Sequence, residues 1–166
     1  MPLAAWRARL RAPARVGLIS DTHGLLRPEA IAALRGCDHI IHAGDIGGRE
    51  ILAALERLAP VTAIRGNNDG GDWARSIPDE AALRVGEARL LVVHDAAPWQ
   101  REAPAGFDAV ISGHSHQPRI ARDGTLLRVN PGSAGPRRFT LPISLGFLRI
   151  SGARIEARLA TLEVSR

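Results

Sequence analysis

The stretch RVGLISDTH, residues 15–23, carries the pattern that decides the predicted fold. Residues 15–20 hold a short apolar run with β-branched side chains, which predicts a buried strand. Asp21 and His23 follow where the chain must turn. Ligands of parallel α/β sheets bind at the carboxyl ends of the strands, so this order predicts a functional site at a sheet edge.

After this stretch, the chain alternates between helical and extended patterns. Residues 28–35 begin with proline and carry apolar residues at helical spacing, and residues 49–58 place their apolar side chains on one helix face. Residues 39–42 and 60–65 are short apolar runs that predict two more strands. The resulting β-α-β-α-β order predicts a parallel sheet with right-handed crossovers.

Hairpins replace helices in the second half of the chain. Residues 82–94, 118–130 and 143–162 each contain two strand-like runs separated by a short turn, and the middle hairpin turns at an Asp-Gly pair. Residues 107–112 predict a single strand between the first two hairpins. We therefore predict a mixed α/β fold in which two β-sheets pack as a sandwich with helices outside.

The composition is that of a soluble globular domain, with 45% hydrophobic and 23% charged residues. We predict an N-terminal extension, frayed or weakly helical, over residues 1–14 and a single domain over residues 15–166. The extension lacks the apolar core of a secretory signal, and no apolar run approaches the roughly 18 residues of a membrane helix. The single cysteine, Cys37, excludes an internal disulfide, so we expect a cytoplasmic protein.

The positive charge does not predict a nucleic-acid partner. The net charge is +5, but all basic residues are arginine and they are scattered along the chain. Aromatic residues make up 4% of the chain, which leaves few platforms for stacking bases. We expect neither nucleic acid nor a membrane as a partner.

Five predicted strands deliver candidate metal ligands where the chain turns after each apolar run. The candidates are Asp21, His23, Asp45, Asn67, His94, His114 and His116. His114 and His116, at i and i+2 of an extended segment, should point to the same side. Carboxylate, amide and imidazole ligands suit divalent Mn, Fe, Co, Ni or Zn. Seven ligands exceed the needs of one four-coordinate ion and suit two ions that share a carboxylate.

The order of these motifs resembles the calcineurin-like metallophosphoesterase superfamily. The matching series is Asp21-x-His23, Gly44-Asp45, Gly66-Asn67, His94 and Gly113-His114-x-His116. The short chain and the segment Asn130-Pro-Gly-Ser133 are similar to the small bacterial and archaeal phosphodiesterase branch of that family. The resemblance extends over residues 15–138 and implies a four-layer fold, a two-sheet sandwich flanked by helices.

The resemblance also implies a dinuclear metal site. Its ligands would be Asp21, His23 and His116 for one ion, Asn67, His94 and His114 for the other, and Asp45 as the bridge. Manganese is the expected metal, with nickel, iron, cobalt or zinc as alternatives. A hydroxide that bridges the two ions would attack a small or nucleotide-like phosphodiester. A phosphomonoesterase on the same site and a non-catalytic protein-interaction scaffold of the same fold are the alternatives.

Two positions depart from the family pattern. Many relatives carry a histidine after the Gly-Asn pair that protonates the leaving group or binds its phosphate, whereas this chain has Asn68, which cannot deliver a proton. We assign Asn68 and Asp69 as candidate catalytic residues and expect a preference for esters with good leaving groups. The branch often has His-Gly-His where this chain has His94-Asp95-Ala96, and Asp95 is expected to support a neighbouring ligand.

Several other residues have weaker functional signals. His39 and His42 lie in or beside a predicted strand and match no motif, so we interpret both as structural. Ser133 or Arg137 could lie near the phosphate of a small phosphoester substrate. An edge strand or the apolar C-terminal hairpin offers a surface for a homo-oligomer.

Overall fold

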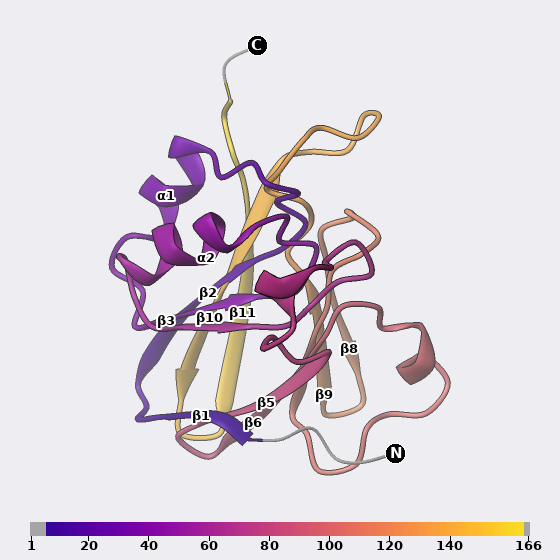
Figure 1. Cartoon of the computed structure of the whole chain (residues 1–166). Coiled ribbons are helices and arrows are strands. Elements are labelled where there is room, and N and C mark those ends of the chain that lie inside the picture. Colours follow the sequence, from indigo (N-terminus) through magenta and orange to yellow (C-terminus); the bar gives the residue numbers. More distant parts are fainter. Residues whose placement is uncertain (1–5, 165–166) are drawn as a thin grey trace.

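Two β-sheets pack face to face in the computed structural model, which describes residues 6–164 of the chain (Figure 1). The six-stranded sheet contains, in order, β1 (Trp6–Leu10), β5 (Glu80–Val85), β6 (Ala88–Val93), β7 (Ala109–Ile111), β9 (Leu126–Asn130) and β8 (Arg119–Asp123). The five-stranded sheet contains, in order, β11 (Arg154–Thr161), β10 (Ser144–Ser151), β2 (Ala14–Ile19), β3 (His39–His42) and β4 (Val61–Ala63). The predicted sandwich is confirmed.

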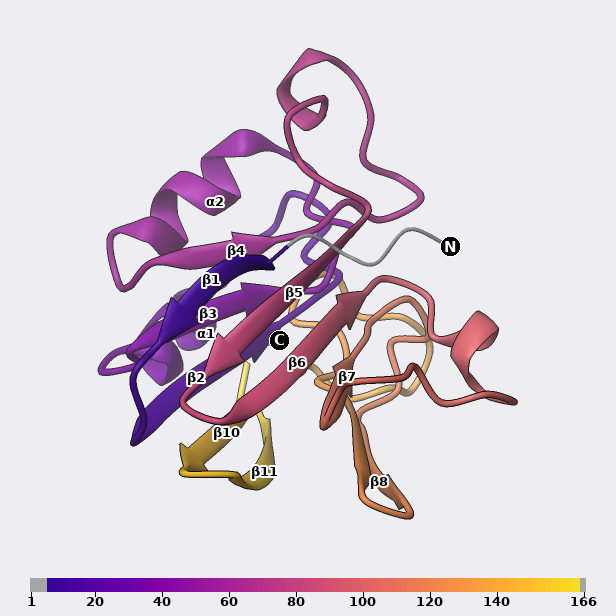
Figure 2. The ribbon, with the colours of Figure 1, turned by 90° about the horizontal axis from the view of Figure 1, so that it is seen from below.

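Parallel crossovers build one half of the five-stranded sheet. Strands β2, β3 and β4 are parallel neighbours, and α1 (Pro28–Leu34) and α2 (Arg49–Glu56) connect them. Both helices lie on the face of this sheet that points away from the other sheet (Figure 1 and Figure 2). The predicted β-α-β-α-β order is therefore confirmed, and it brings the carboxyl ends of three strands to one edge.

The six-stranded sheet is built largely from hairpins, as predicted. Strands β5–β6 and β8–β9 are antiparallel pairs, whereas β6, β7 and β9 run parallel to one another. No α-helix covers the outer face of this sheet in the described part of the chain. Instead Trp99, from the short 3-10 helix η2 (Ala97–Trp99), and Phe107 pack against Leu91, Val93 and neighbouring apolar side chains. The expected outer helices thus cover one sheet only.

The N-terminal segment differs from the prediction. Residues 6–10 form β1, which pairs in parallel with β5, so the expectation of a frayed or weakly helical extension was wrong for this part. The reason is that the outer side of β5 offers unpaired backbone groups that the segment can bond. Residues 1–5 of the predicted extension lie outside the described residues. No helix within residues 6–164 is long and apolar enough to cross a membrane.

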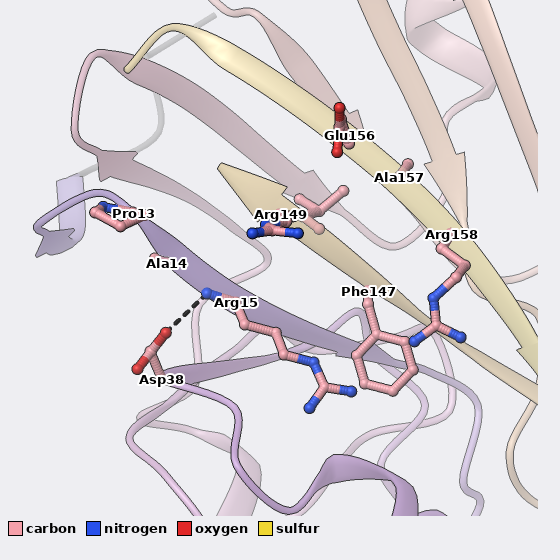
Figure 3. Close-up of a pocket in the computed structure, with 10 residues that line it drawn as sticks. Pro13, Ala14, Arg15, Asp38, Phe147, Arg149, Glu156, Ala157 and Arg158 are labelled. Carbon is pink, nitrogen blue, oxygen red and sulfur yellow. Dashed lines mark hydrogen bonds between the residues drawn. The ribbon is translucent and has the colours of Figure 1, made fainter. Parts of the chain in front are cut away.

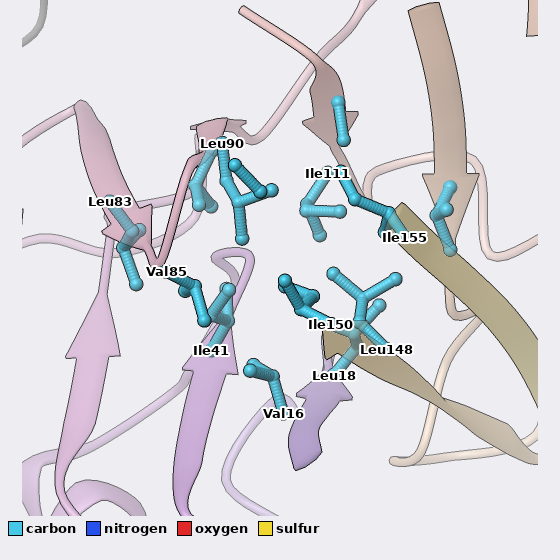
Figure 4. Close-up of a cluster of buried hydrophobic side chains, with 14 of the residues drawn as sticks. Val16, Leu18, Ile41, Leu83, Val85, Leu90, Ile111, Leu148, Ile150 and Ile155 are labelled. Atoms are coloured by element: carbon cyan, nitrogen blue, oxygen red, sulfur yellow. The ribbon is translucent and has the colours of Figure 1, made fainter. Parts of the chain in front are cut away.

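Apolar side chains from both sheets fill the space between them (Figure 4). Val16 and Leu18 of β2 join this core, together with Leu90 and Ile111 of the opposite sheet. Between them, Gly17 faces α1, and a Cβ atom at this position would lie 2.5 Å from Leu34 Cδ2. The glycine therefore lets α1 pack directly on the sheet.

Candidate metal centre

Three of the predicted ligands form a compact group at the carboxyl end of β2. Asp21 Oδ1 lies 3.3 Å from His116 Nε2 and 3.9 Å from His23 Nε2. The two imidazole Nε2 atoms are 3.4 Å apart, although their residues are 93 positions apart in the chain. The structure thus brings the turn after β2 and the turn after β7 to the same point.

The other four predicted ligands lie beside this group. Asp45 Oδ2 is 3.3 Å from His94 Nε2 and 3.7 Å from His23 Nε2, so the carboxylate stands between the two halves of the cluster. Asn67 Oδ1 is 3.1 Å from His94 Nε2 and 3.2 Å from His114 Nδ1. All seven predicted side chains therefore lie within one cluster.

Five of the seven predicted ligands have left-handed backbone conformations. They are Asp21 (φ 55°), His23 (φ 46°), Asp45 (φ 53°), His114 (φ 71°) and His116 (φ 61°). Such conformations cost non-glycine residues on the order of 1 kcal/mol each and concentrate at functional sites. The expectation that His114 and His116 share a side because the chain is extended was wrong, since both lie in a tight turn after β7 that directs them into the cluster.

The imidazole of His94 is oriented for metal binding. Its Nδ1 lies 2.7 Å from the carbonyl oxygen of Ala43, which can only accept, so Nδ1 carries the proton. The lone pair of Nε2 therefore points toward the cluster, as it does when a second hydrogen bond fixes the tautomer of a metal-bound histidine. Glycines make room nearby, because a Cβ atom on Gly113 would lie 2.7 Å from Asp21 Oδ2.

A buried chain of hydrogen bonds supports two of the ligand-bearing turns. The Gly44 amide donates to Nδ1 of His42, so the Nε2 atom of this neutral imidazole donates to Thr22 Oγ1, and that hydroxyl donates to the Ile46 carbonyl. Burial lowers the pKa of His42 to about 3, which keeps it neutral. His42 is structural, as predicted, and it connects the turn holding Asp21 and His23 to the turn holding Asp45.

The cluster contains buried polar atoms that suit a cation. Ser20 Oγ and the His114 amide donate to Asp21 Oδ2, whereas Asp21 Oδ1 is buried without a hydrogen-bond partner among the described residues. Burial raises the pKa of Asp21 despite the opposing effects of Ser20 and His116. Burial also lowers the pKa of His116, which favours the neutral imidazole that can bind a metal ion. An unpartnered carboxylate oxygen among imidazole nitrogens fits a divalent metal ion.

Asp45 remains the more acidic of the two carboxyl groups. Burial raises its pKa, but the backbone and side-chain hydrogen bonds from Asn68, together with His94 and His23, more than offset this and lower it overall. Asn68 donates from its amide to Asp45 Oδ1 and from Nδ2 to Oδ2, both at 2.9 Å. The Asn68 side chain is therefore occupied with orienting this carboxylate.

The carboxylate of Asp69 bonds only backbone groups among the described residues. It accepts the amides of Ile46, Gly47 and Gly66 at 2.9 to 3.0 Å, which ties the turn after β3 to the turn after β4. This arrangement favours positioning roles for Asn68 and Asp69 over the catalytic roles expected for them. Asp95, in turn, accepts the amide of Ala97 and supports that local turn.

Three supporting residues were not identified as such from the sequence. Asn130 Nδ2 donates to the Gly113 carbonyl and to Ser115 Oγ, and so holds the turn that carries His114 and His116. Ser133 Oγ donates to the Asp21 carbonyl at 2.9 Å. Thr22 is the third. The only signal in the sequence was the Asn-Pro-Gly-Ser segment, because side-chain bonds between distant turns leave no local pattern.

Two hollows in the surface have different relations to the cluster. A hollow of about 560 Å³ adjoins it, since His114 and Gly113 line one end, and Arg119, Arg128 and Asp95 line other parts. A slightly larger hollow of about 600 Å³ lies on the outer face of the five-stranded sheet, where Arg15 and Arg158 stack over Phe147 (Figure 3). None of the seven predicted ligands lines this second hollow, so the first is the candidate substrate pocket.

Comparison with known proteins identifies the family. Residues 15–153 match the model of the calcineurin-like phosphoesterase superfamily domain. A protein of Methanothermobacter thermautotrophicus described as a "Probable metallophosphoesterase" is 34% identical over 157 residues, which cover 87% of this chain and 90% of the relative. The chain belongs to the calcineurin-like phosphoesterase superfamily, a family of metal-dependent phosphoesterases, and the predicted resemblance is confirmed.

Solved structures have the same fold. An archaeal phosphodiesterase superimposes with a TM-score of 0.73 at 25% identity, covering 89% of this chain and 99% of that protein. Vacuolar protein sorting 29 from Cryptosporidium parvum superimposes with a TM-score of 0.75 at 19% identity, covering 92% of this chain and 98% of that protein. At 19% identity, the similarity to vacuolar protein sorting 29 shows a shared fold alone.

Proposed function

We propose that the protein is a dinuclear metal-dependent phosphodiesterase that acts on a small or nucleotide-like phosphodiester. The observation that carries this proposal is the cluster of seven side chains, in which Asp45 Oδ2 lies between His23 and His94 while Asp21 Oδ1 is buried without a hydrogen-bond partner among the described residues. A cluster of this composition with an unpartnered carboxylate oxygen is suited to bind divalent cations.

We assign the ligands as the family resemblance implies. Asp21, His23 and His116 would hold one ion, Asn67, His94 and His114 would hold the other, and Asp45 would contact both. Two bound divalent ions supply charge to stabilise the phosphoryl oxygens and an activated water at neutral pH. Manganese is our first candidate, with nickel, iron, cobalt and zinc as alternatives, in a cytoplasmic protein.

The protein's own residues have definable tasks in this reaction. Asn68 keeps Asp45 ionised and oriented, and the Ala43 carbonyl fixes the tautomer of His94. Asn68 cannot protonate a leaving group, because an amide does not titrate at neutral pH, and the Asp69 carboxylate is engaged with three backbone amides. We therefore expect water to protonate the leaving group and the rate to depend steeply on the pKa of the leaving alcohol.

The hollow beside His114 supports a diester substrate. Its volume of about 560 Å³ suits a bound organic group, and Arg119, Arg128, Asp95 and the polar residues around it can orient such a group. A monoester carries one organic group, whereas a diester carries a second that needs space beside the metal ligands. The archaeal phosphodiesterase of similar fold agrees with this choice.

The test compares bis-p-nitrophenyl phosphate with p-nitrophenyl phosphate as substrates. Chelated protein would be reloaded in turn with manganese, nickel, cobalt, zinc and magnesium, and bound metal would be counted per chain. We expect metal-dependent hydrolysis that favours the diester, with about two ions per chain. Tight metal binding without hydrolysis of either ester, or of aryl esters with still better leaving groups, would contradict the proposal and favour the protein-interaction alternative.

A further inference from the structure

The loop between β9 and β10 leaves directly from the metal centre. Ser133 Oγ bonds the Asp21 carbonyl, and a Cβ atom on Gly135 would lie 2.5 Å from the same carbonyl oxygen. Two nitrogens of the Arg27 guanidinium donate to the Gly135 carbonyl at 3.2 Å. The start of the loop is therefore fixed to the ligand-bearing turn after β2, and the residues that follow project past it (Figure 1).

Phe139 in this loop is unusual in two respects. Phe139 is 88% exposed. Ile120, another exposed large apolar residue among those described, is only 40% exposed. The φ of Phe139 is 54°, a left-handed conformation that is a genuine outlier for a bulky side chain. Exposure and strain both cost free energy and contribute nothing to the core, which is typical of residues that are kept for binding.

Two arginines precede Phe139, and neither forms an ion pair with another described residue. Arg138 follows Gly135 by only three positions, and Gly135 packs against the ligand-bearing turn after β2, so the fold keeps Arg138 within a short length of chain of that turn. Within the described residues, the Arg137 guanidinium makes one long hydrogen bond of 3.4 Å, to the Leu141 carbonyl in the same loop. The sequence contains no acidic residue between Asp123 and Glu156, so the loop supplies no carboxylate of its own to neutralise these charges.

We propose that Arg138 and Phe139 form a recognition loop for phosphoesters that carry an aromatic group, with nucleotides as the substrate class. The guanidinium would pair with phosphate oxygens, and the exposed ring would stack on a base that extends away from the metal centre. The inference rests on the proposed phosphoesterase function and narrows its substrate class. Phe139 suits such a ligand because ring stacking accepts any base and needs no buried pocket.

The test uses two ligands that differ only by a base, AMP and ribose 5-phosphate. Dissociation constants would be measured by calorimetry on the metal-loaded protein, with phosphate release followed in the same samples. If either ester is hydrolysed, its KM replaces the dissociation constant. We expect AMP to bind at least about fivefold more tightly, from the stacking of one base.

Substitutions assign this preference to the loop. Phe139→Ala should bring the ratio of the two constants close to one without changing the constant for ribose 5-phosphate, whereas Phe139→Trp should keep the preference. Arg138→Gln should weaken both ligands by a similar factor. Ile120→Ala, the matched control at another exposed apolar residue, should change neither.

Three outcomes would overturn the inference. In the first, the wild-type protein binds AMP and ribose 5-phosphate equally well, and in the second, Phe139→Ala still prefers AMP. In the third, Phe139→Ala keeps both dissociation constants and differs from the wild-type protein only in forming a smaller oligomer, as measured by light scattering. A protein that hydrolyses diesters but lacks the preference would refute the recognition loop and leave the proposed function intact. A Phe139-dependent preference without hydrolysis of any ester would support the loop and refute the proposed function.

Discussion

Removal of the Asn68 side chain should weaken metal binding even though Asn68 is not an expected ligand. Asn68→Ala deletes the bond from Nδ2 to Asp45 Oδ2 and leaves the backbone bond to Oδ1. Asp45 is only 3% exposed, so water cannot readily replace the lost donor. A hydrogen bond to a charged group contributes about 1.5 to 3 kcal/mol, which corresponds to a roughly 10- to 100-fold loss of metal affinity.

Competition against a chelator of known affinity measures this loss directly. The pKa of Asp45 should rise in Asn68→Ala, because a hydrogen bond that lowers it is gone. The acidic limb of the activity profile should therefore move to higher pH. Asn68→Asp is the matched control with an unchanged shape, and its carboxylate should repel Asp45 and weaken binding further.

A third variant separates orientation from proton donation. Asn68→His, which supplies an imidazole that can donate a proton, should flatten the dependence of the rate on the leaving-group pKa while the number of bound ions stays the same. Chelator competition curves that superimpose for the wild-type protein and Asn68→Ala would refute the reasoning, since Asn68 would then contribute nothing to the state of Asp45.

Other perturbations address different parts of the structure. Asp45→Ala should lose metal at both positions and abolish hydrolysis, and metal analysis that still finds two ions per chain would contradict the bridging assignment. Gly113→Ala should lower the free energy of unfolding by about 1 to 3 kcal/mol in a urea titration, because its Cβ would lie 2.7 Å from Asp21 Oδ2. His42 gives a pH dependence: its pKa falls from about 6.5 in the unfolded chain to about 3 in the fold, so the unfolded state takes up the proton first and stability should fall between pH 6.5 and 3. The stability of His42→Gln should decline less over this range, and equal slopes would contradict the assignment.

The parts of the fold that follow local patterns could be predicted. The apolar runs at 15–20 and 39–42 became β2 and β3, and the apolar face of residues 49–58 became α2, because burial on one side leaves a periodic signal. Strand β1 was missed although WRARL alternates apolar residues with arginine, as strands often do, because its pairing with β5 is a contact between distant segments that leaves no local signal.

The site could be predicted in its residue types but not in its finer geometry. Polar residues after five strands indicated the ligands, since strand ends converge in such sheets. The left-handed conformations, the Thr22–His42 bond and the side-chain bond from Asn68 to Asp45 depend on turns that meet only in the folded chain. The catalytic role expected for Asp69 likewise came from its place in the motif, whereas its three backbone bonds come from the fold.

The most direct test of the central claim is the location of bound metal by anomalous scattering from crystals grown with manganese, with data collected on either side of its absorption edge. The account predicts two peaks in the cluster, one beside His23 and His116 and the other beside His94 and His114, with Asp45 contacting both. A single peak, or peaks away from these side chains, would contradict the dinuclear centre.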